Sequence, residues 1–240
     1  MNRSAIWHDV ECGGYAADLE VWERLAARTG GPVLELGCGT GRVSLHLARR
    51  RQDVWGLDAD PALLGSLRAK AACEGLAVET VCADARGFEL EREFGLIVAP
   101  MQLLQVLGGR TARVAAVGSA AAHLAAHGRL AVAIVEPRDA ARAESIVALP
   151  DVRELDGWVY SSLPVAVDTS GGRLEICRLR QAVAPDGTLH AEEHRDLLDA
   201  LSAEEAEAEA VAAGLHPAGR IEVPSADGYG GSTVVVAERP

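Results

Sequence analysis

The 240-residue sequence lacks any run of about 18 apolar residues, the length that a membrane-crossing helix needs, so we expect no membrane contact. Its first segment, MNRSAIWHDVECGGY, also lacks the apolar stretch of a secretory signal peptide. Together these two absences predict a cytoplasmic protein.

A cysteine pattern that would bind zinc or form a disulfide framework is also missing. The five cysteines are an odd number, lie far apart and include no CxxC pair. We therefore expect no metal site and interpret the cysteines as buried, reduced thiols. They are Cys12, Cys38, Cys73, Cys82 and Cys177.

Positive charge is scarce. Arginine and lysine total 23 against 35 acidic residues, which gives a formal net charge of −12, and Lys70 is the single lysine. An acidic chain repels phosphate groups overall, whereas proteins that bind nucleic acids usually carry a basic face. The composition therefore argues against a nucleic-acid partner.

Short apolar strands alternate with helical patterns up to residue 137. This alternation predicts a parallel sheet covered on both faces, that is, an open, doubly wound, Rossmann-like α/β fold. Ligands of such folds bind at the carboxyl ends of the strands. The expected strands are 33–36, 53–57, 77–82, 95–99 and 129–135, and the expected helices are 16–28, 42–50, 61–74 and 111–126.

The rhythm changes after residue 137. A short helix over 138–148 precedes three extended segments, and turn signals such as Pro185-Asp186-Gly187 join them into a small antiparallel β insertion. A helix over 203–213 and strands at 219–223 and 232–238 follow. We therefore divide the chain into an N-terminal lid helix and cofactor-binding core (1–137), the insertion (138–200) and the end of the core (201–240). The extended segments are 156–167, 173–184 and 188–198.

The most informative motif is VLELGCGTG, a strand followed by a glycine-rich turn at residues 33–41. Glycines allow a ligand to approach the backbone, and the helix that follows offers free N–H groups. A dinucleotide site, the main alternative, usually reads GxGxxG. Here the spacing is GxGxG, Arg42 stands where the third glycine would fall, and Glu35 would repel a pyrophosphate.

Two acidic residues follow the next strands. Asp58 ends the second strand about 20 positions after the glycines, where a carboxylate can bind two ribose hydroxyls, although proteins that bind NAD share this feature. Asp84 follows the third strand and could accept a hydrogen bond from an adenine amine. As an alternative, each aspartate could simply cap a local turn.

In this order and spacing, the segments VLELGCGTGRVSLHLA, VWGLDADPALL, VCADAR, FGLIVAPMQLLQVL and HLAAHGRLAVAIVEP resemble class I S-adenosylmethionine-dependent methyltransferases. The resemblance covers about residues 15–137 and resumes near residue 203. It implies a seven-stranded, mostly parallel sheet whose last strand is antiparallel. It also implies S-adenosylmethionine as methyl donor and S-adenosylhomocysteine as product.

The resemblance assigns cofactor contacts along the chain. The glycine turn would line the methionine and ribose groups, Asp58 would hold the ribose, and the residues after the fourth strand would face the sulfonium. The implied set is Tyr15, Glu35, Gly37, Cys38, Gly39, Gly41, Asp58, Ala59, Leu63, Asp84, Ala85, Pro100, Met101 and Gln102. Ala99-Pro100-Met101-Gln102 departs from the Asn/Asp-Pro-Pro-Tyr/Phe tetrad of enzymes that methylate nucleobase amines, which disfavours that activity.

Methyl transfer is a direct displacement at an activated sulfonium, so the protein mainly has to align the acceptor. A base is needed only for an acceptor that must lose a proton, and the candidates are Glu136, His194 and His8. The resemblance implies a small-molecule acceptor, methylated on O or N. It leaves the insertion open as an acceptor roof or a homodimer contact. A non-catalytic protein that keeps the fold also remains an alternative.

Overall fold

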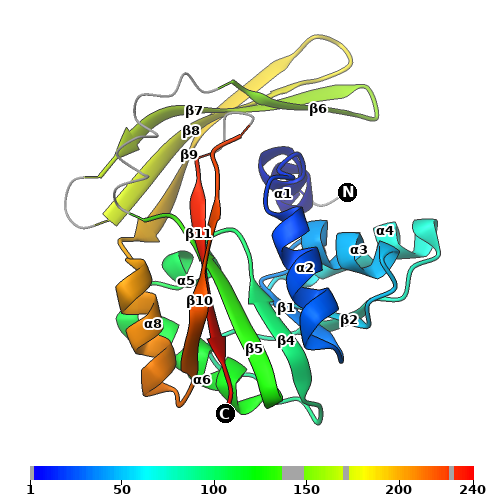
Figure 1. Cartoon of the computed structure of the whole chain (residues 1–240). Helices are drawn as coiled ribbons and strands as arrows, with labels where there is room; N and C mark the ends of the chain where they lie inside the picture. The colour runs from blue at the N-terminus through cyan, green and yellow to red at the C-terminus, as the bar shows by residue number, and fades with distance from the viewer. Residues whose placement is uncertain (1–2, 137–148, 170–172, 227–229) are drawn as a thin grey trace.

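The computed structural model describes residues 3–136, 149–169, 173–226 and 230–240, and Figure 1 shows its two sheets with helix α1 between them. The helix that we predict over 138–148 lies outside the described residues. The three-part division at residues 137 and 200 stays a prediction.

The larger sheet, which we call the core sheet, has seven strands in the order β10-β11-β5-β4-β1-β2-β3. β11 pairs antiparallel with both of its neighbours, and the other neighbouring strands pair in parallel. The predicted doubly wound sheet with an antiparallel last strand is therefore confirmed. The strands are β1 (Val33–Leu36), β2 (Val54–Asp58), β3 (Glu79–Cys82), β4 (Phe94–Ala99), β5 (Leu124–Ile134), β10 (His216–Val223) and β11 (Ser232–Glu238).

Helices cover both faces of the core sheet. One face carries α2 (Leu19–Thr29), α3 (Arg42–Arg49) and α4 (Pro61–Glu74), and the other carries α5 (Leu103–Val106), α6 (Arg110–Ala122) and α8 (Ala203–Ala212). Because β1 and β4 lie between these two layers, every residue of both strands is buried. This double burial explains why their sequences are continuous apolar runs.

Two helix starts follow the local chemistry that the sequence predicts. The Asp60 side chain accepts a hydrogen bond from the Ala62 N–H at the start of α4, and Pro61 occupies the first turn. Ser202 and Glu205 form the predicted capping box at the start of α8. Each cap fixes the direction in which a strand end leads into its helix.

The predicted alanine-rich helix over 111–126 is too long. α6 ends at Ala122, and β5 begins at Leu124, which is already in register with Phe94 of β4. The Phe94 N–H donates to the His123 carbonyl over 2.8 Å, so strand pairing overrides the helical preference of the alanines. α1 (Arg3–Cys12) lies in the N-terminal segment for which a lid helix is predicted, whereas α5 and strand β6 (Asp151–Leu155) were not predicted.

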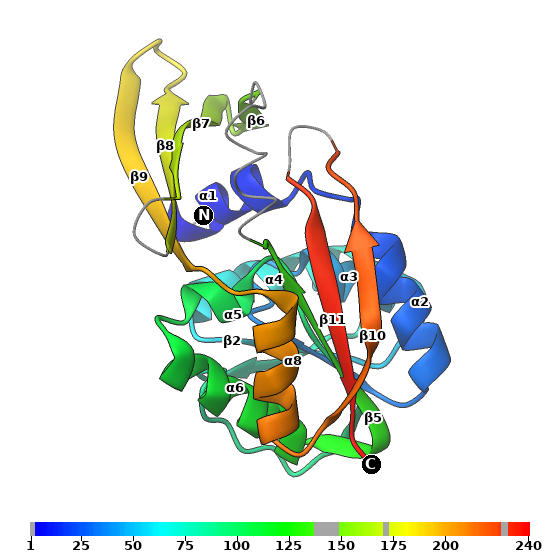
Figure 2. The ribbon, with the colours of Figure 1, turned by 60° about the vertical axis from the view of Figure 1, so that its left-hand side comes forward.

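The smaller sheet, which we call the roof, is antiparallel, in the order β6-β7-β8-β9. It adds β7 (Trp158–Asp168), β8 (Arg173–Val183) and β9 (Leu189–Asp199) to β6. Figure 2 shows β8 and β9 rising away from the core sheet with α1 beneath them. The predicted antiparallel β insertion is therefore confirmed.

Buried polar side chains join the roof to the core at the end of β9. The Gln105 amide donates to the carbonyls of Val135 and Asp199 over 3.0 and 2.9 Å. The Asp199 carboxylate also pairs with Arg113, which binds the buried Glu209 over 2.9 Å. This joint ties both the end of β5 and helix α8 to the base of the roof.

In the described parts of the chain, no helix is long and apolar enough to cross a membrane, and no cluster of three or more potential ligands could hold a metal ion. All five cysteines are free, but only Cys38 is buried, and Cys73 and Cys82 are exposed. The expectation that the thiols are buried is therefore wrong for these two, which lie near the ends of α4 and β3.

Candidate cofactor and acceptor site

The glycine turn leaves the carboxyl end of β1 and leads into α3. Gly37, Gly39 and Gly41 have φ angles of 62°, 54° and 92°, in the left-handed region that favours glycine. A Cβ atom on Gly39 would lie only 2.1 Å from Nε2 of His8 in α1. Position 39 thus requires glycine for two reasons: the left-handed backbone conformation and the close approach of α1.

The Asp58 carboxylate braces this turn from the end of β2. It accepts a hydrogen bond from the Gly39 N–H over 2.8 Å and another from the Asp60 N–H over 2.9 Å. The structure therefore brings together two of the predicted cofactor residues, Gly39 and Asp58. Ala59 follows at the exposed edge, and Leu63 lies partly buried in the first turn of α4.

Glu35 is a buried residue of strand β1, one position before the strand ends, and it accepts a hydrogen bond from the Ser44 hydroxyl of α3. Burial raises the pKa of Glu35 to about 7, and the hydrogen bond from Ser44 limits this rise. The carboxyl group is therefore tied to α3, and its contact with a ligand stays a prediction.

Two predicted contacts turn their side chains into the core. Cys38 packs against Leu64 and Leu67 of α4, and Ala85 is buried in the core on the opposite face of the sheet. Burial also raises the pKa of the Cys38 thiol. A ligand at the strand ends would therefore meet the backbone of these residues rather than their side chains.

Asp84 lies after β3 and forms an ion pair with a neighbouring side chain. The Arg86 guanidinium and its backbone N–H both donate to this carboxylate, and they lower the pKa of Asp84 to about 2. Asp84 remains partly exposed, so its predicted contact with adenine would compete with Arg86.

The segment after β4 has a strained backbone. Met101 and Gln102, which follow Pro100, have φ angles of 48° and 59°. A left-handed non-glycine residue costs on the order of 1–3 kcal/mol, and such strain concentrates at functional sites. The strain lies where the resemblance places the contacts to the sulfonium.

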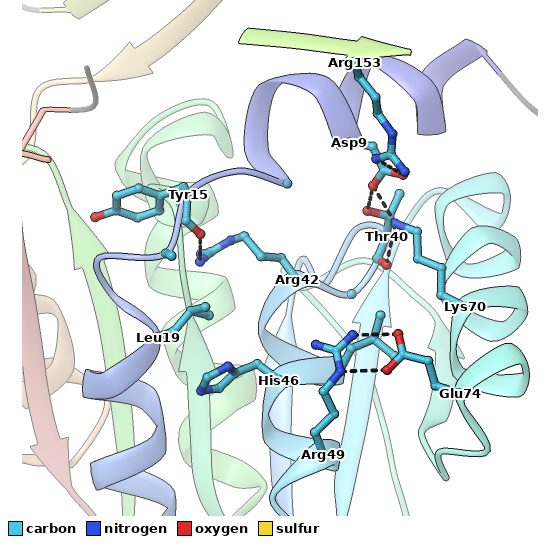
Figure 3. A pocket seen from close by; sticks show the side chains of 14 residues that line it. Asp9, Tyr15, Leu19, Thr40, Arg42, His46, Arg49, Lys70, Glu74 and Arg153 are labelled. Atoms are coloured by element: carbon cyan, nitrogen blue, oxygen red, sulfur yellow. Dashed lines mark hydrogen bonds and ion pairs between the residues drawn. The ribbon is translucent and has the colours of Figure 1, made fainter. Parts of the chain in front are cut away.

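Helix α1 is clasped to the glycine turn through Asp9, as Figure 3 shows. The buried Asp9 carboxylate accepts hydrogen bonds from the Thr40 hydroxyl and from Lys70 Nζ, the latter over 2.6 Å, and Arg153 of β6 lies 3.0 Å away. Asp9 thus joins α1, the glycine turn, α4 and the roof.

His8, a candidate base, belongs to the same contact between α1 and the turn. Its Nδ1 lies 3.2 Å from the Thr40 hydroxyl. Burial lowers the pKa of His8, and the charges of Asp9 and Asp58 oppose that effect. Its imidazole therefore covers the glycine turn itself rather than standing in a separate acceptor cleft.

Tyr15 lies in the link between α1 and α2. Arg42 donates to the Tyr15 carbonyl over 3.0 Å, pairs with the buried Asp18, and lies 5.1 Å from the centre of the Tyr15 ring. A cavity of about 250 Å³ opens beside this link, and Tyr15 and Gly41 are among its lining residues (Figure 3). Arg42 therefore anchors α2 and does not point toward a bound phosphate.

The other two candidate bases lie at the far side of the strand ends. Glu136 is buried just after β5, with its Oε1 3.1 Å from the Thr233 hydroxyl. His194 lies on β9, with its Nε2 3.2 Å from Oδ1 of Asp196. The three candidates therefore occupy three separate places: the turn, the end of β5 and the roof.

Sequence reasoning missed the residues that hold α1 in place. Asp9, Lys70 and Arg153 lie on three separate elements and carry no local motif. Glu11 similarly binds Arg180 through two contacts of 2.6 Å and accepts from Ser162. The available signal was that Asp9 and Glu11 stand beside the apolar residues Trp7 and Val10 in α1.

Known proteins match the turn and the fold. Residues 33–128 match the family described as "Methyltransferase domain". The uncharacterized methyltransferase YodH of Bacillus subtilis (strain 168) is 33% identical over 72 residues, which are 30% of this chain and 31% of that protein. The chain therefore matches about a third of the length of this curated relative.

Solved structures resemble the core sheet together with the roof. The sugar N-methyltransferase KedS8 from Streptoalloteichus sp ATCC 53650 has a TM-score of 0.77 at 21% identity, with 100% of this chain and 93% of that chain covered. CalS10 from Micromonospora echinaspora, an amino pentose methyltransferase solved with bound S-adenosylmethionine, has a TM-score of 0.74 at 21% identity, with 100% and 98% covered. At this identity the likeness establishes the fold.

Proposed function

We propose that this protein transfers the methyl group of S-adenosylmethionine to a nitrogen or oxygen atom of a small-molecule acceptor, releasing S-adenosylhomocysteine. The observation that carries the proposal is the glycine turn braced by Asp58 inside a methyltransferase domain. The turn, the Asp58 carboxylate and the strained segment after β4 all lie at the carboxyl edge of the core sheet, where this fold binds its ligands.

The residues present fit this cofactor. The glycines expose backbone groups that an amino-acid moiety can contact, and Asp58 offers acceptors for ribose hydroxyls. Ala59, Leu63 and Asp84 would flank the adenine, and Pro100, Met101 and Gln102 would lie near the methyl group. Tyr15 and Glu35 would complete the methionine end. When bound, the cofactor supplies an activated methyl group on a positively charged sulfur.

A nitrogen acceptor is favoured within this proposal. KedS8 is named a sugar N-methyltransferase, and CalS10 an amino pentose methyltransferase. Two carboxylates lie at one end of the edge: Glu136 and Glu222 are 3.1 and 3.3 Å from the Thr233 hydroxyl. Negative charge at the mouth of a cleft attracts a protonated amine.

This chain would contribute mainly alignment. The roof and α1 enclose the strand ends, and a well-oriented nucleophile can gain about 7–11 kcal/mol over an unaligned one. Their enclosure would also exclude water, which would strengthen the interactions of the acidic groups with the acceptor.

Titration calorimetry with S-adenosylmethionine and S-adenosylhomocysteine tests the proposal. We expect binding to the wild type and about 10–100-fold weaker binding to Asp58→Ala, since hydrogen bonds to a charged group contribute about 1.5–3 kcal/mol. Asp53→Ala is the matched control, because Asp53 precedes the other end of β2 and pairs with Arg92 at the surface. No binding to the wild type at millimolar concentrations would contradict the proposal.

A further inference from the structure

The roof has an inner face that spans the space between the core and α1. Residues that lie opposite one another on β8 and β9 point to the same face of the roof. Three such pairs succeed one another along the inner face: Leu174–Leu198, Arg178–His194 and Ala182–His190. At one end, Leu174 and Leu198 pack with Val135 just beyond β5. At the other end, Ala182 packs with Ile6, Trp7 and Val10 of α1.

The middle of this face therefore lies between the end of β5 and α1, on the side of the strand ends. His194 stands four residues from Leu198, which is roughly 13 Å along a strand. Burial raises the pKa of Cys12, the last residue of α1, to about 11, and the charges of Arg42, Glu11, Arg178 and Asp196 also act on this thiol. Arg178 and Asp196 of the roof therefore lie on the side of the roof that faces α1.

Three polar side chains form a chain of contacts at this position. His194 Nε2 lies 3.2 Å from Asp196 Oδ1, and Arg178 Nε lies 3.3 Å from Asp196 Oδ2. Arg178 is 15% exposed and His194 is 38% exposed, so the arginine is the inner member and the imidazole is the accessible one. Asp151 of β6 lies 3.7 Å from Arg178 Nη1.

The contact with Asp196 fixes the tautomer of His194. A carboxylate can only accept a hydrogen bond, so the proton of a neutral imidazole must lie on Nε2. Nδ1 then carries the lone pair, and it has no hydrogen-bond partner among the described residues. His8 differs, because its Nδ1 faces the Thr40 hydroxyl and its Nε2 faces Gly39.

We infer that His194 is the base that accepts the proton of a primary ammonium acceptor at Nδ1, with Asp196 and Arg178 as its positioning residues. The inference deepens the proposed function and rests on it. The N–H bond of the ammonium breaks, its electron pair stays on nitrogen, and the proton moves to Nδ1. The neutral amine can then attack the methyl carbon, whose bonding electrons return to sulfur. His194 finally releases its proton to water.

The surroundings of His194 suit this substrate class. The charged groups around it are Asp196 and Glu192 on β9, Arg178 and Arg180 on β8, Asp151 on β6 and Glu11 on α1. Arg180 and Glu11 neutralise one another, as do Arg3 and Glu192. Asp151 and Asp196 both lie beside Arg178, so two carboxylates accompany the imidazole on the inner face of the roof.

The first test needs no acceptor. Long-range ¹H–¹⁵N spectra of histidine-labelled protein, with His194 assigned through the His194→Asn variant, report which ring nitrogen carries the proton. We expect the Nε2–H tautomer for neutral His194 and a mixture of tautomers in Asp196→Asn. An Nδ1–H tautomer in the wild type would overturn the assignment.

The second test follows methylation of a panel of primary amines headed by D-glucosamine, with release of S-adenosylhomocysteine as the readout, between pH 6 and 9.5. His194→Asn should lower kcat at pH 7 about 100-fold, within the usual range for general base catalysis, and leave KM within twofold. The deficit should shrink at pH 9.5, where more of the amine is already neutral. His190→Asn, on the same strand and stacked on Trp158, is the matched control.

Unchanged kcat in His194→Asn, or an equal loss at every pH, would overturn the inference. So would a protein that binds S-adenosylmethionine but methylates no amine of the panel. In both cases calorimetry would still show cofactor binding, whereas failure of the proposed function would abolish that binding in the wild type.

Discussion

In the core sheet, β1 and β4 are buried along their whole length, whereas β8 and β9 of the roof leave most of their residues partly or fully exposed. The core sheet is covered by helices on both faces, while the roof meets α1 and the end of β5 on one face only. Apolar burial, at roughly 25 cal/mol per Å², therefore holds the core together. The roof is held by two small apolar clusters and by ion pairs such as that of Glu11 with Arg180.

This contrast explains what the sequence could predict. The positions of β1, Asp58 and helix α4 follow from contiguous apolar runs, glycines and caps, which are local signals. The contacts of Asp9 with Lys70 and of Glu11 with Arg180 join residues far apart in the chain. No local pattern encodes them, so the role of α1 as a bridge between the glycine turn and the roof could not be predicted.

The site divides in the same way. The glycine turn and Asp58 come together as predicted, because parallel strands bring their carboxyl ends to one edge. The inward side chain of Cys38 and the pairing of Asp84 with Arg86 depend on packing and on a neighbouring charge. Residue types and spacing alone do not specify either feature.

The largest expected effect is in the core. Phe94→Ala removes a fully buried ring from β4 and should lower the free energy of unfolding by about 3–5 kcal/mol, through lost burial and a residual cavity. Urea denaturation measures it. Leu197→Ala on the exposed face of β9 is the control, for which we expect a change below about 0.5 kcal/mol. Equal losses in the free energy of unfolding for the two variants would contradict the idea that apolar burial stabilises the core sheet more than the roof.

A somewhat smaller effect is expected at the joint between the sheets. Arg113→Ala would remove the close partner of the buried Glu209 carboxylate and leave it the exposed Arg110, whose Nε lies 3.9 Å away. The change should destabilise the protein by about 3 kcal/mol. Arg110→Ala, one turn earlier and exposed, is the matched control. If thermal or urea unfolding of Arg113→Ala matched that of the wild type, the ion pairs of Arg113 would not stabilise the protein.

A local effect is expected where the roof meets α1. Burial raises the pKa of Glu11, but the hydrogen bonds from Arg180 and Ser162 outweigh it, and the net pKa lies below the ordinary value of 4.5. Because the pKa of Glu11 is lower in the folded protein than in the unfolded chain, the ionised Glu11 carboxylate stabilises the fold above pH 4.5. This stabilisation is lost as the pH falls through the pKa of Glu11 in the folded protein. Glu11→Gln should therefore speed hydrogen exchange of the α1 amides at pH 7 about tenfold, equivalent to about 1.4 kcal/mol.

The pH dependence of hydrogen exchange in the α1 amides provides the control for this prediction. The difference between Glu11→Gln and the wild type should narrow as the pH is lowered below 4.5, and Glu154→Gln on the exposed side of β6 should match the wild type throughout. A difference that persists unchanged at low pH would show that the charge of Glu11 does not hold α1.

The smallest expected effect is a gain in stability. A Cβ added to Gly118 in the middle of α6 would meet no atom within 4 Å. Gly118→Ala should raise the free energy of unfolding by about 0.5–1 kcal/mol, because alanine loses less backbone entropy in a helix. Gly39→Ala should instead lower stability and cofactor affinity, since its Cβ would collide with His8. Denaturation curves of the two variants compare free and constrained glycines directly.

The ion pair between Asp9 and Lys70 has a practical consequence. Lys70 is the only lysine of the sequence, and its ammonium is engaged by the carboxylate of α1. An amine-selective reagent therefore has one side-chain target, whose reactivity depends on whether the first helix is docked. Labelling kinetics at this position would time the opening of the protein without any engineered probe.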